Sequence, residues 1–589
     1  MEHLSLLAGG QEHTVADWER EAAAVLRKAG RLAADDADSA VWDKLTRTTL
    51  DGIAVTPLGT PGPSAADAAT RGTIAARASE GWDNRPVFSD PDAAQSAADV
   101  VTDLENGATS LWLTVGAGGI AVSDLAVVLD KVLLDIAPVA LESTDPVAAA
   151  EALVSVLDAK GVSAAPGTSL GADPIGDTVR GEDADVAAVV ERVAEIARSR
   201  NLLAITVDAT VVHDLGASDV QELGYSLAAG AAYLRLLTAA GLSVEDAAAL
   251  MEFRYAATDE QFPTIAKLRA ARRLWARMLE LSGASESARG QRQHAVTSRP
   301  MMTKYDPWVN MLRTTVAAFA AGVGGAQAVT VLPFDAALGL PDAFSRRIAR
   351  NTSSLLISEA HVGKVIDPAG GSYAVERLTD DLAQAGWAEL GRLEEAGGVL
   401  AAVADGSLRA RIDEVVARRD AEIARRKRPV TGVSEFPNLH EVLPERKPYP
   451  ASARKVRSYA AAFEAMRDDA PAQPVFLATL GSIAAHTARA TFAHNLLAAG
   501  GVDTVSAGPT ESADDLVAAY DMQPVVCLCG TDAAYAEWGA EAIAALRAAG
   551  ASYVILAGRP GEGIEVDDSA AMGIDALAFL TRVREELGK

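Results

Sequence analysis

The chain has 589 residues, 49% of them hydrophobic and only two of them cysteines, and its formal net charge is −27. This composition excludes wholesale disorder and a disulfide framework, and it favours a reducing, cytoplasmic setting. The acidic excess disfavours nucleic acid as a partner, and no apolar run reaches the roughly 18 residues that a membrane-spanning helix needs. We also expect no secretory signal, because no basic region precedes the short apolar segment 4–10.

Residues 1–60 predict an N-terminal arm and not a domain. Val15–Lys28 carries apolar residues at helical spacing, and the stretch that follows it is broken by Gly and Pro up to residue 63. An arm with one apolar face and no core of its own must lie on another surface. We therefore expect it to contact either the body of this chain or a second chain.

Residues 61–426 alternate short apolar runs with Ala-rich helical segments. Helices are expected at 92–104 and 185–198, and buried strands are expected at 110–115, 138–142, 203–207 and 328–332. Strands separated by helices indicate βαβ units and a parallel sheet. More than 300 residues without an evident linker suit a (β/α)8 TIM barrel better than an open sheet, although the pattern reveals only four or five strands.

Residues 427–474 are dense in Pro and charge, which predicts a partly extended linker. After it the alternation restarts on a smaller scale over 475–589. Strands are expected at 475–480, 502–505, 525–529 and 553–557, and helices at 483–499, 514–520, 532–549 and 575–587. Short βα repeats of this kind predict a flavodoxin-like, doubly wound domain whose ligand site lies at the carboxyl ends of the strands.

Four motifs, in chain order, resemble the adenosylcobalamin-dependent methylmalonyl-CoA mutases. They are LTRTTLDGIAVTPL (45–58), KLRAARRLWARM (267–278), FSRRIARNTSSLL (344–356) and KVIDPAGGSYAVERLTDDLAQAGW (364–387). The resemblance covers most of the chain. It implies a TIM barrel followed by a flavodoxin-like domain of the cobalamin-binding type. It also implies a link to the radical interconversion of (R)-methylmalonyl-CoA and succinyl-CoA.

The cobalamin motif of that family is absent from this sequence. The catalytic chains carry D-x-H-x-x-G after the first strand of the C-terminal domain, where the imidazole binds cobalt. In the same register this chain has Ile483, Ala485 and Ala488, and His486 is one position away. None of the eight histidines has an Asp two residues before it. The resemblance therefore implies no cobalt ligand, no cofactor-binding residue and no metal site on this chain.

Two barrel positions of the family's catalytic chains are also changed. The position of a Tyr between corrin and substrate falls on Val87, while Arg85 is retained. The position of a His that binds the thioester carbonyl falls on Val211, with His213 two residues further along a presumed strand. Arg180 is the remaining candidate for the substrate carboxylate. These changes imply no catalytic residue and fit the small, non-catalytic chain of the heterodimeric bacterial enzymes.

Two pairs of residues allow both a functional and a structural interpretation. His486 and His494 lie on one predicted helix. They could form a displaced metal site, or they could be two ordinary polar residues. Cys527 and Cys529 lie on one predicted strand. They could be a metal-binding or redox pair, or they could be buried residues that pack as small apolar side chains. The structural interpretation is favoured for both pairs, because neither has the further ligands that a metal needs.

Three other segments also allow a functional or a structural interpretation. The Gly-rich loop 558–563 could bind phosphate, or it could be the remnant of an ancestral loop that has lost this role. The second interpretation is favoured, because the loop lacks the P-loop spacing. The basic residues of 267–278 could bind CoA phosphates or form a salt-bridged face toward solvent or a partner. Arg350-Asn351-Thr352 is expected to be structural.

The resemblance thus implies the small subunit of a heterodimeric methylmalonyl-CoA mutase. The resemblance implies that a large subunit binds adenosylcobalamin and acyl-CoA, and that this chain holds no cofactor. Trp18, Leu26 and the helix 267–278 are expected to contact that partner. Two alternatives remain open: a self-sufficient enzyme that uses a repurposed barrel site on another acyl-CoA, and an assembly scaffold or chaperone for a cobalamin enzyme.

Overall fold

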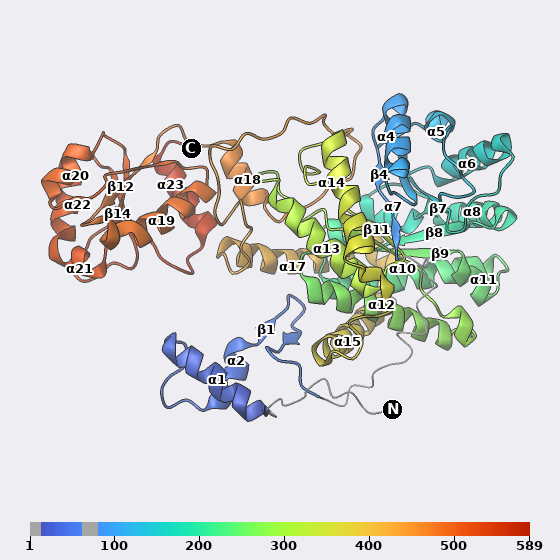
Figure 1. The fold of residues 1–589 in the computed structure, drawn as a ribbon, viewed down its shortest axis with the longest axis horizontal. Coiled ribbons are helices and arrows are strands. Elements are labelled where there is room, and N and C mark those ends of the chain that lie inside the picture. The colour runs from blue at the N-terminus through green and yellow to red at the C-terminus, as the bar shows by residue number, and fades with distance from the viewer. Residues whose placement is uncertain (1–12, 62–80) are drawn as a thin grey trace.

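The computed structural model describes residues 13–61 and 81–589. A barrel and a smaller α/β domain lie beside each other, and residues 15–45 of the N-terminal arm project away from both (Figure 1). The rest of the arm contacts the barrel: the Ser218 hydroxyl donates to Asp51, and Ile53 packs in the barrel core. The apolar segment 4–10 and the expected start of the barrel at 62–80 lie outside the described residues. Within the described ranges, no helix combines the length and the apolar character needed to cross a membrane.

The larger domain is a closed barrel of eight parallel strands. Its sheet runs in the order β3-β11-β10-β9-β8-β7-β6-β5-β4, and β3 and β4 are two halves of one extended segment. β3 pairs with β11 and β4 pairs with β5, so the sheet closes on itself and confirms the predicted TIM barrel. The strands are β3 (Asp83–Asn84), β4 (Val87–Phe88), β5 (Leu111–Val115), β6 (Val139–Ser143), β7 (Ser169–Ala172), β8 (Leu203–Asp208), β9 (Met251–Ala257), β10 (Gln293–Thr297) and β11 (Ala328–Thr330).

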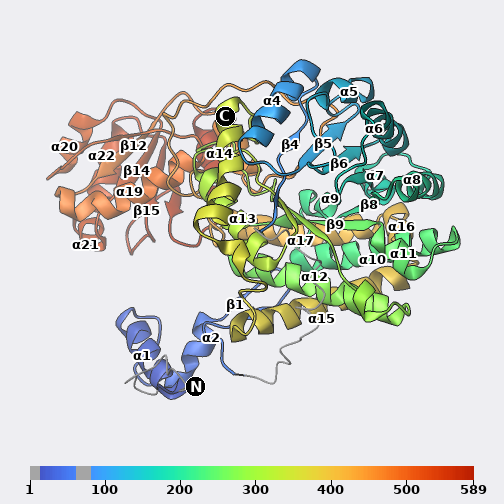
Figure 2. The same cartoon turned by 45° about the vertical axis from the view of Figure 1, so that its right-hand side comes forward.

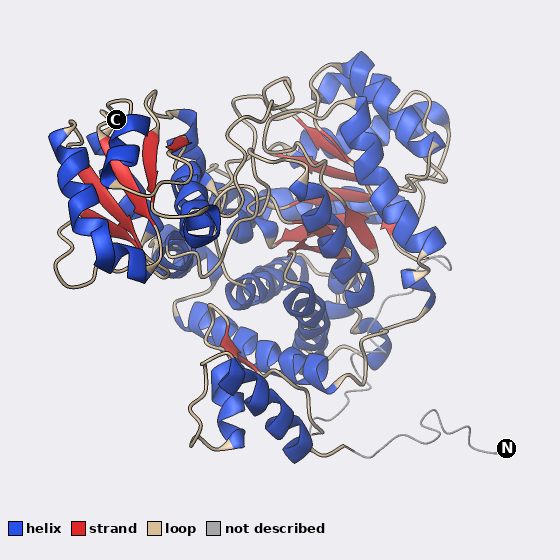
Figure 3. Cartoon of the chain, turned by 60° about the vertical axis from the view of Figure 1, so that its left-hand side comes forward, coloured by secondary structure: helices blue, strands red, loops and turns tan. Residues whose placement is uncertain are grey.

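Helices surround the barrel strands (Figure 3). The sequence sets their ends locally: in α6, Asp145 caps the amide of Ala148, Pro146 opens the first turn, and Gly161 ends the helix at φ 65°. The helices of this part of the chain are α4 (Ala93–Glu105), α5 (Leu125–Val128), α6 (Pro146–Lys160), α7 (Pro174–Arg180), α8 (Val186–Arg200), α9 (Thr210–Asp214), α10 (Asp219–Ala239), α11 (Val244–Ala249), α12 (Gln261–Leu281), α13 (Val309–Gly324), α14 (Ala343–Ser354), α15 (Tyr373–Glu395), α16 (Val399–Ala404) and α17 (Ser407–Ala424).

The smaller domain contains a five-stranded parallel sheet in the order β13-β12-β14-β15-β16. This order is that of flavodoxin, so the predicted doubly wound domain is confirmed. Its strands are β12 (Val475–Thr479), β13 (Thr504–Ser506), β14 (Val525–Cys529), β15 (Tyr553–Ala557) and β16 (Asp568–Ala570). Its helices are α19 (Ile483–Ala499), α20 (Ala513–Ala519), α21 (Asp532–Ala534), α22 (Ala540–Ala548) and α23 (Ala576–Glu586).

The arm has a small core of its own, which corrects the prediction of a coreless arm. α1 (Val15–Lys28) and α2 (Val41–Leu45) enclose a cluster that includes the buried Leu26. Trp18 packs on Trp42 with ring centroids 4.7 Å apart. Leu26 therefore faces the interior of the arm and is not available to a partner. A short hairpin of β1 (Arg47–Thr48) and β2 (Ala54–Val55) follows the two helices (Figure 2).

The segment between the two domains contains α18 (Ala461–Asp468) and runs across the carboxyl ends of the barrel strands. The Ser452 hydroxyl donates to the carbonyl of Ala117. Further along, the backbone amides of Arg457 and Tyr459 donate to the carbonyls of Asp214 and Pro300 over 2.9 Å. The linker thus covers the end of the barrel at which TIM-barrel enzymes place their active sites.

Candidate functional site at the barrel mouth

Charged side chains from three strands meet at the carboxyl end of the barrel. Glu142 lies on β6, Asp208 ends β8, and Arg254 lies on β9. The Arg254 guanidinium is 3.1 Å from the Asp208 carboxylate and 3.3 Å from the Glu142 carboxylate. It also stacks on Trp112, 4.1 Å from the ring centroid. Two carboxylates therefore share the guanidinium of Arg254, and further cations are needed to balance their charge.

The linker supplies one of these cations, Arg454. Its guanidinium lies 2.6 Å from Glu142 and 2.8 Å from Asp208, and it donates to the Thr210 hydroxyl over 3.2 Å. Burial alone would raise the pKa of Asp208, but Arg454 and Arg254 offset that effect and hold this pKa well below its ordinary value. Both carboxylates therefore stay charged and paired. Arg454 closes the mouth as an internal counter-ion.

The two expected substrate-binding positions on the next loops are engaged within the chain. Arg180 pairs with Asp177 at 2.8 Å and with Asp208 at 3.2 Å, so its charge is already neutralised. Val211 is buried on the short helix α9, which corrects the expectation of a strand there. On the same helix, the His213 imidazole lies 2.7 Å from the Ser298 hydroxyl.

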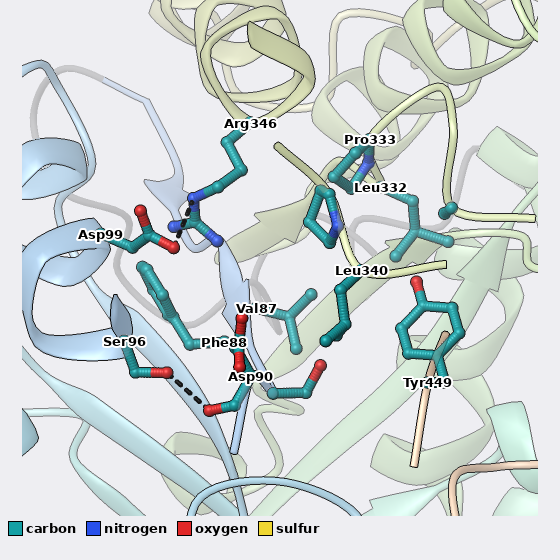
Figure 4. A pocket seen from close by; sticks show the side chains of 13 residues that line it. Val87, Phe88, Asp90, Ser96, Asp99, Leu332, Pro333, Leu340, Arg346 and Tyr449 are labelled. Carbon is teal, nitrogen blue, oxygen red and sulfur yellow. Dashed lines mark hydrogen bonds and ion pairs between the residues drawn. The ribbon is translucent and has the colours of Figure 1, made fainter. Parts of the chain in front are cut away.

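Val87 lines a small pocket beside the mouth, between β4 and the loop after β11 (Figure 4). Phe88, Leu332 and Arg346 share this pocket, and Tyr449 of the linker closes one side of it (Figure 4). Its volume is about 40 Å³. Ligand pockets span roughly 300–1,000 Å³, so this space takes a few water molecules and not an acyl-CoA.

Arg85, which is retained from the family's barrel motif, is fully buried inside the barrel. Its guanidinium pairs with Glu252 at 2.8 Å, and Arg292 pairs with the same carboxylate at 2.9 Å. His294 on β10 is also buried, and burial together with Arg85 lowers its pKa well below the ordinary value. The barrel interior is thus filled by a network of its own charged and polar side chains.

Asp173, directly after β7, gives the barrel mouth a pH-dependent stability. Its carboxylate accepts a hydrogen bond from the Tyr233 hydroxyl over 2.7 Å, and burial raises its pKa to about 7. The unfolded chain releases this proton near pH 4, so stability falls as pH rises from about 4 to about 7, by up to about 4 kcal/mol. We expect Asp173→Asn to remove this loss, which urea unfolding at pH 5 and pH 8 would measure.

The control for that prediction is Asp183→Asn, because Asp183 is exposed. The difference in unfolding free energy between pH 5 and pH 8 should be the same in this variant as in the natural chain. An Asp173→Asn variant with the natural pH dependence would contradict the prediction.

The small domain does not fit a corrin at its predicted site. Ile483 begins α19 with its side chain largely exposed, and neither it nor Ala485 or Ala488 carries a metal-binding atom. The His486 ring is buried, and its Nδ1 lies 3.2 Å from the carbonyl of Gly481. No group of three or more His, Cys, Asp or Glu side chains with metal-site geometry occurs in the described part of the chain. The three positions of the family's cobalamin motif, Ile483, Ala485 and Ala488, therefore offer cobalt no axial ligand.

Arg489 occupies the carboxyl edge of the same sheet. It donates to the carbonyl of Ala557 and pairs with Asp532 at 2.7 Å. A Cβ atom at Gly558 would lie 1.9 Å from the Arg489 guanidinium, so the Gly-rich loop 558–563 begins against this side chain. The Arg489 guanidinium is already engaged by the Ala557 carbonyl and by Asp532, which favours the structural interpretation over a phosphate site.

The contacts of the remaining candidate residues favour structural roles for them. His494 lies 2.7 Å from the Thr504 hydroxyl, and Cys527 and Cys529 are buried free thiols with sulfur atoms 4.0 Å apart. Arg350 pairs with Asp103 at 2.6 Å. These contacts all lie within the chain.

Three of the five cations of 267–278 are buried in α12 and do not form the expected salt-bridged surface, whereas Arg273 and Arg277 lie at the surface. Lys267 pairs with Glu222 at 2.6 Å, and Arg269 pairs with Asp367 at 2.8 Å. Arg272 is also buried and donates to Gln293. This charge joins α12 to the rest of the barrel and is not free to bind CoA phosphates.

The most important residue that the sequence did not reveal is Arg454. The sequence analysis singled out neither Glu142 nor Asp208, and the charged linker 427–474 gave no sign of which carboxylates it reaches. Only the fold brings residues 142, 208 and 454 together.

Comparison with known proteins places these features in a family. A family model described as methylmalonyl-CoA mutase matches residues 96–510. The methylmalonyl-CoA mutase small subunit of Streptomyces virginiae is 48% identical, over 99% of this chain and 98% of that protein. The small subunit of Propionibacterium freudenreichii subsp. shermanii is 38% identical, over 99% and 96%. The methylmalonyl-CoA mutase of Escherichia coli (strain K12) is 34% identical, over 54% and 44%. The chain therefore belongs to the methylmalonyl-CoA mutase family, and it matches the family's small subunits over nearly its whole length.

Proposed function

We propose that this chain is the non-catalytic small subunit of a heterodimeric, adenosylcobalamin-dependent methylmalonyl-CoA mutase of the cytoplasm. The large subunit binds the cofactor and the acyl-CoA and interconverts (R)-methylmalonyl-CoA and succinyl-CoA. This chain contributes a folded barrel and a small domain to the assembly, and no ligand to the cobalt.

The observation that carries the proposal is the barrel mouth occupied by Arg454. A guanidinium balanced by Glu142 and Asp208 lies at the end of the barrel where a substrate would react. The aliphatic side chains of Ile483 and Ala485 support the same conclusion for the small domain, because cobalt binding requires a donor atom. Two buried free thiols agree with a reducing compartment.

The proposal predicts that the chain alone does not bind adenosylcobalamin. Titration of the purified chain should leave the corrin absorption spectrum unchanged, whereas the co-purified heterodimer should shift it in proportion to its large subunit. A control titration uses the large subunit alone. A stoichiometric shift with the isolated small chain at low micromolar affinity would refute the non-binding role.

Two further measurements separate this proposal from its alternatives. Calorimetry of the isolated chain with succinyl-CoA should give no binding heat, because the barrel mouth is filled; binding would favour a self-sufficient enzyme. Size exclusion after co-expression should give a stable one-to-one complex with the large subunit. A transient or substoichiometric association would instead favour an assembly scaffold.

A further inference from the structure

The helix α14 lies on the barrel with its charged side inward. Arg346 and Arg350 are buried and pair with Asp103 of α4 at 2.5 Å and 2.6 Å. Amphipathic helices of soluble domains ordinarily turn their apolar side to the core. Here the buried ion pairs fix the opposite orientation, and the apolar side of α14 points outward.

The outward side of α14 continues onto α13, which lies beside it (Figures 1 and 2). Trp308, Leu312, Phe344 and Leu355 have 42–69% of their surface exposed. Ile348 is half-buried and lies on α14 between Phe344 and Leu355, the residue that follows α14. We name these five residues the α13–α14 face.

Aromatic rings join the two helices of this face. Phe334 packs between them, with its ring centroid 4.8 Å from Trp308 and 6.1 Å from Phe344. Contiguous exposed patches of aromatic and aliphatic residues mark protein interfaces, and aromatic residues dominate the binding energy there. The α13–α14 face therefore has the composition of an interface.

Charge argues against a second copy of this chain as the occupant. Arg347 is exposed and stacks on Phe344 at 5.4 Å, and Lys364 is exposed at the end of the 3-10 turn Val362–Lys364, which packs on α13. Within the described ranges, neither forms an ion pair with an acidic side chain. A symmetric contact between copies would bring these cations against themselves, and it would join two chains of net charge −27.

We propose that the α13–α14 face binds the large subunit of the heterodimer. The inference rests on the proposed function, because the small-subunit relatives that match nearly the whole chain supply the reason to expect a different partner chain. Trp308 and Phe344 are the aromatic anchors of the contact, and Arg347 with Lys364 favours an acidic rim on the partner.

The test is the double variant Phe344→Glu/Leu355→Glu, co-expressed with the large subunit. Both side chains are exposed, so the variant should fold, with an unchanged circular dichroism spectrum and melting temperature. We expect its affinity for the large subunit, measured by interferometry with the full chains, to fall at least 100-fold. Size exclusion should then resolve two separate chains.

The matched control is Leu133→Glu/Ile136→Glu. These residues follow α5 on another part of the barrel and are 63% and 70% exposed. This variant adds the same charge to comparably exposed apolar positions, and its affinity should stay within threefold of the natural chain. If Phe344→Glu/Leu355→Glu is poorly folded, Leu312→Glu alone serves as the test variant with the same expected loss of binding.

The outcomes separate the inference from the proposed function. If the natural chain does not associate with the large subunit, the proposed function fails. If it associates and the α13–α14 variants bind as tightly as the natural chain, the inference alone fails. If the natural chain forms homodimers that Phe344→Glu/Leu355→Glu dissociates, the face joins two copies and the inference is also overturned.

Discussion

Replacing Arg454 with alanine should destabilise the barrel by about 3–5 kcal/mol. The Arg454 side chain is 17% exposed and balances two carboxylates, of which Asp208 is fully buried. Its removal leaves Glu142 and Asp208 with too little positive charge in a region of low dielectric. Urea unfolding followed by tryptophan fluorescence measures the effect, because Trp112 stacks on the Arg254 guanidinium of the same cluster.

The linker itself provides the control for this prediction. Arg457 pairs with Asp420 at 2.6 Å, but both side chains are nearly half exposed. Arg457→Ala should therefore cost less than about 1 kcal/mol. Equal effects of the two substitutions would show that Arg454 is an ordinary surface residue. Because Arg454 acts on stability, the heterodimer containing Arg454→Ala should keep its mutase turnover at temperatures where it stays folded.

The sequence predicted well those elements whose apolar pattern is uninterrupted. The strands 525–529 and 553–557 and the helix 483–499 coincide with β14, β15 and α19. In these strands nearly every residue is buried, which is what a continuous apolar run in a parallel sheet indicates. The flavodoxin-like domain could therefore be predicted from the local apolar pattern alone.

Two of the barrel strands that the sequence did not reveal, β9 and β10, carry charged or polar side chains into the barrel. β9 includes Glu252 and Arg254, and β10 includes His294, and all three are buried in ion pairs or hydrogen bonds. Such strands do not look apolar, because their inward side chains are matched by partners more than thirty residues away. β7 was missed for another reason: Gly171 adopts φ 68° where the register shifts.

Some features of the candidate site could also be predicted from the sequence, and others could not. The absence of a cobalt ligand at Ile483 and Ala485 follows from residue type and needs no structure. The filling of the barrel mouth depends on where the linker runs, and no local pattern encodes the contact between Arg454 and Glu142. The lack of a ligand atom is therefore visible in the sequence, whereas the presence of an internal counter-ion in the barrel mouth is visible only in the fold.

The second large effect is expected at Lys267, where the sequence suggested a contact with CoA or a partner. The Lys267 ammonium is fully buried between Glu222, at 2.6 Å, and Asp219, at 2.8 Å. Burial opposes its charge, but the two carboxylates raise its pKa above the ordinary value. Lys267→Met should cost about 3–5 kcal/mol, because Glu222 is also fully buried and loses its counter-ion.

A double-mutant cycle tests whether this cost arises from the ion pair. In Lys267→Met/Glu222→Gln the charge of the fully buried Glu222 is gone, and only Asp219, whose side chain is 26% exposed, keeps a charge without Lys267. The amide oxygen still accepts the hydrogen bond from the backbone of Ala256. We expect the double variant to recover to within about 1–2 kcal/mol of the natural chain. Arg277→Met, at an exposed position of the same helix, should have little effect. A double variant that folds normally but no longer binds the large subunit would instead place α12 in the interface, and would restore the role that the sequence suggested.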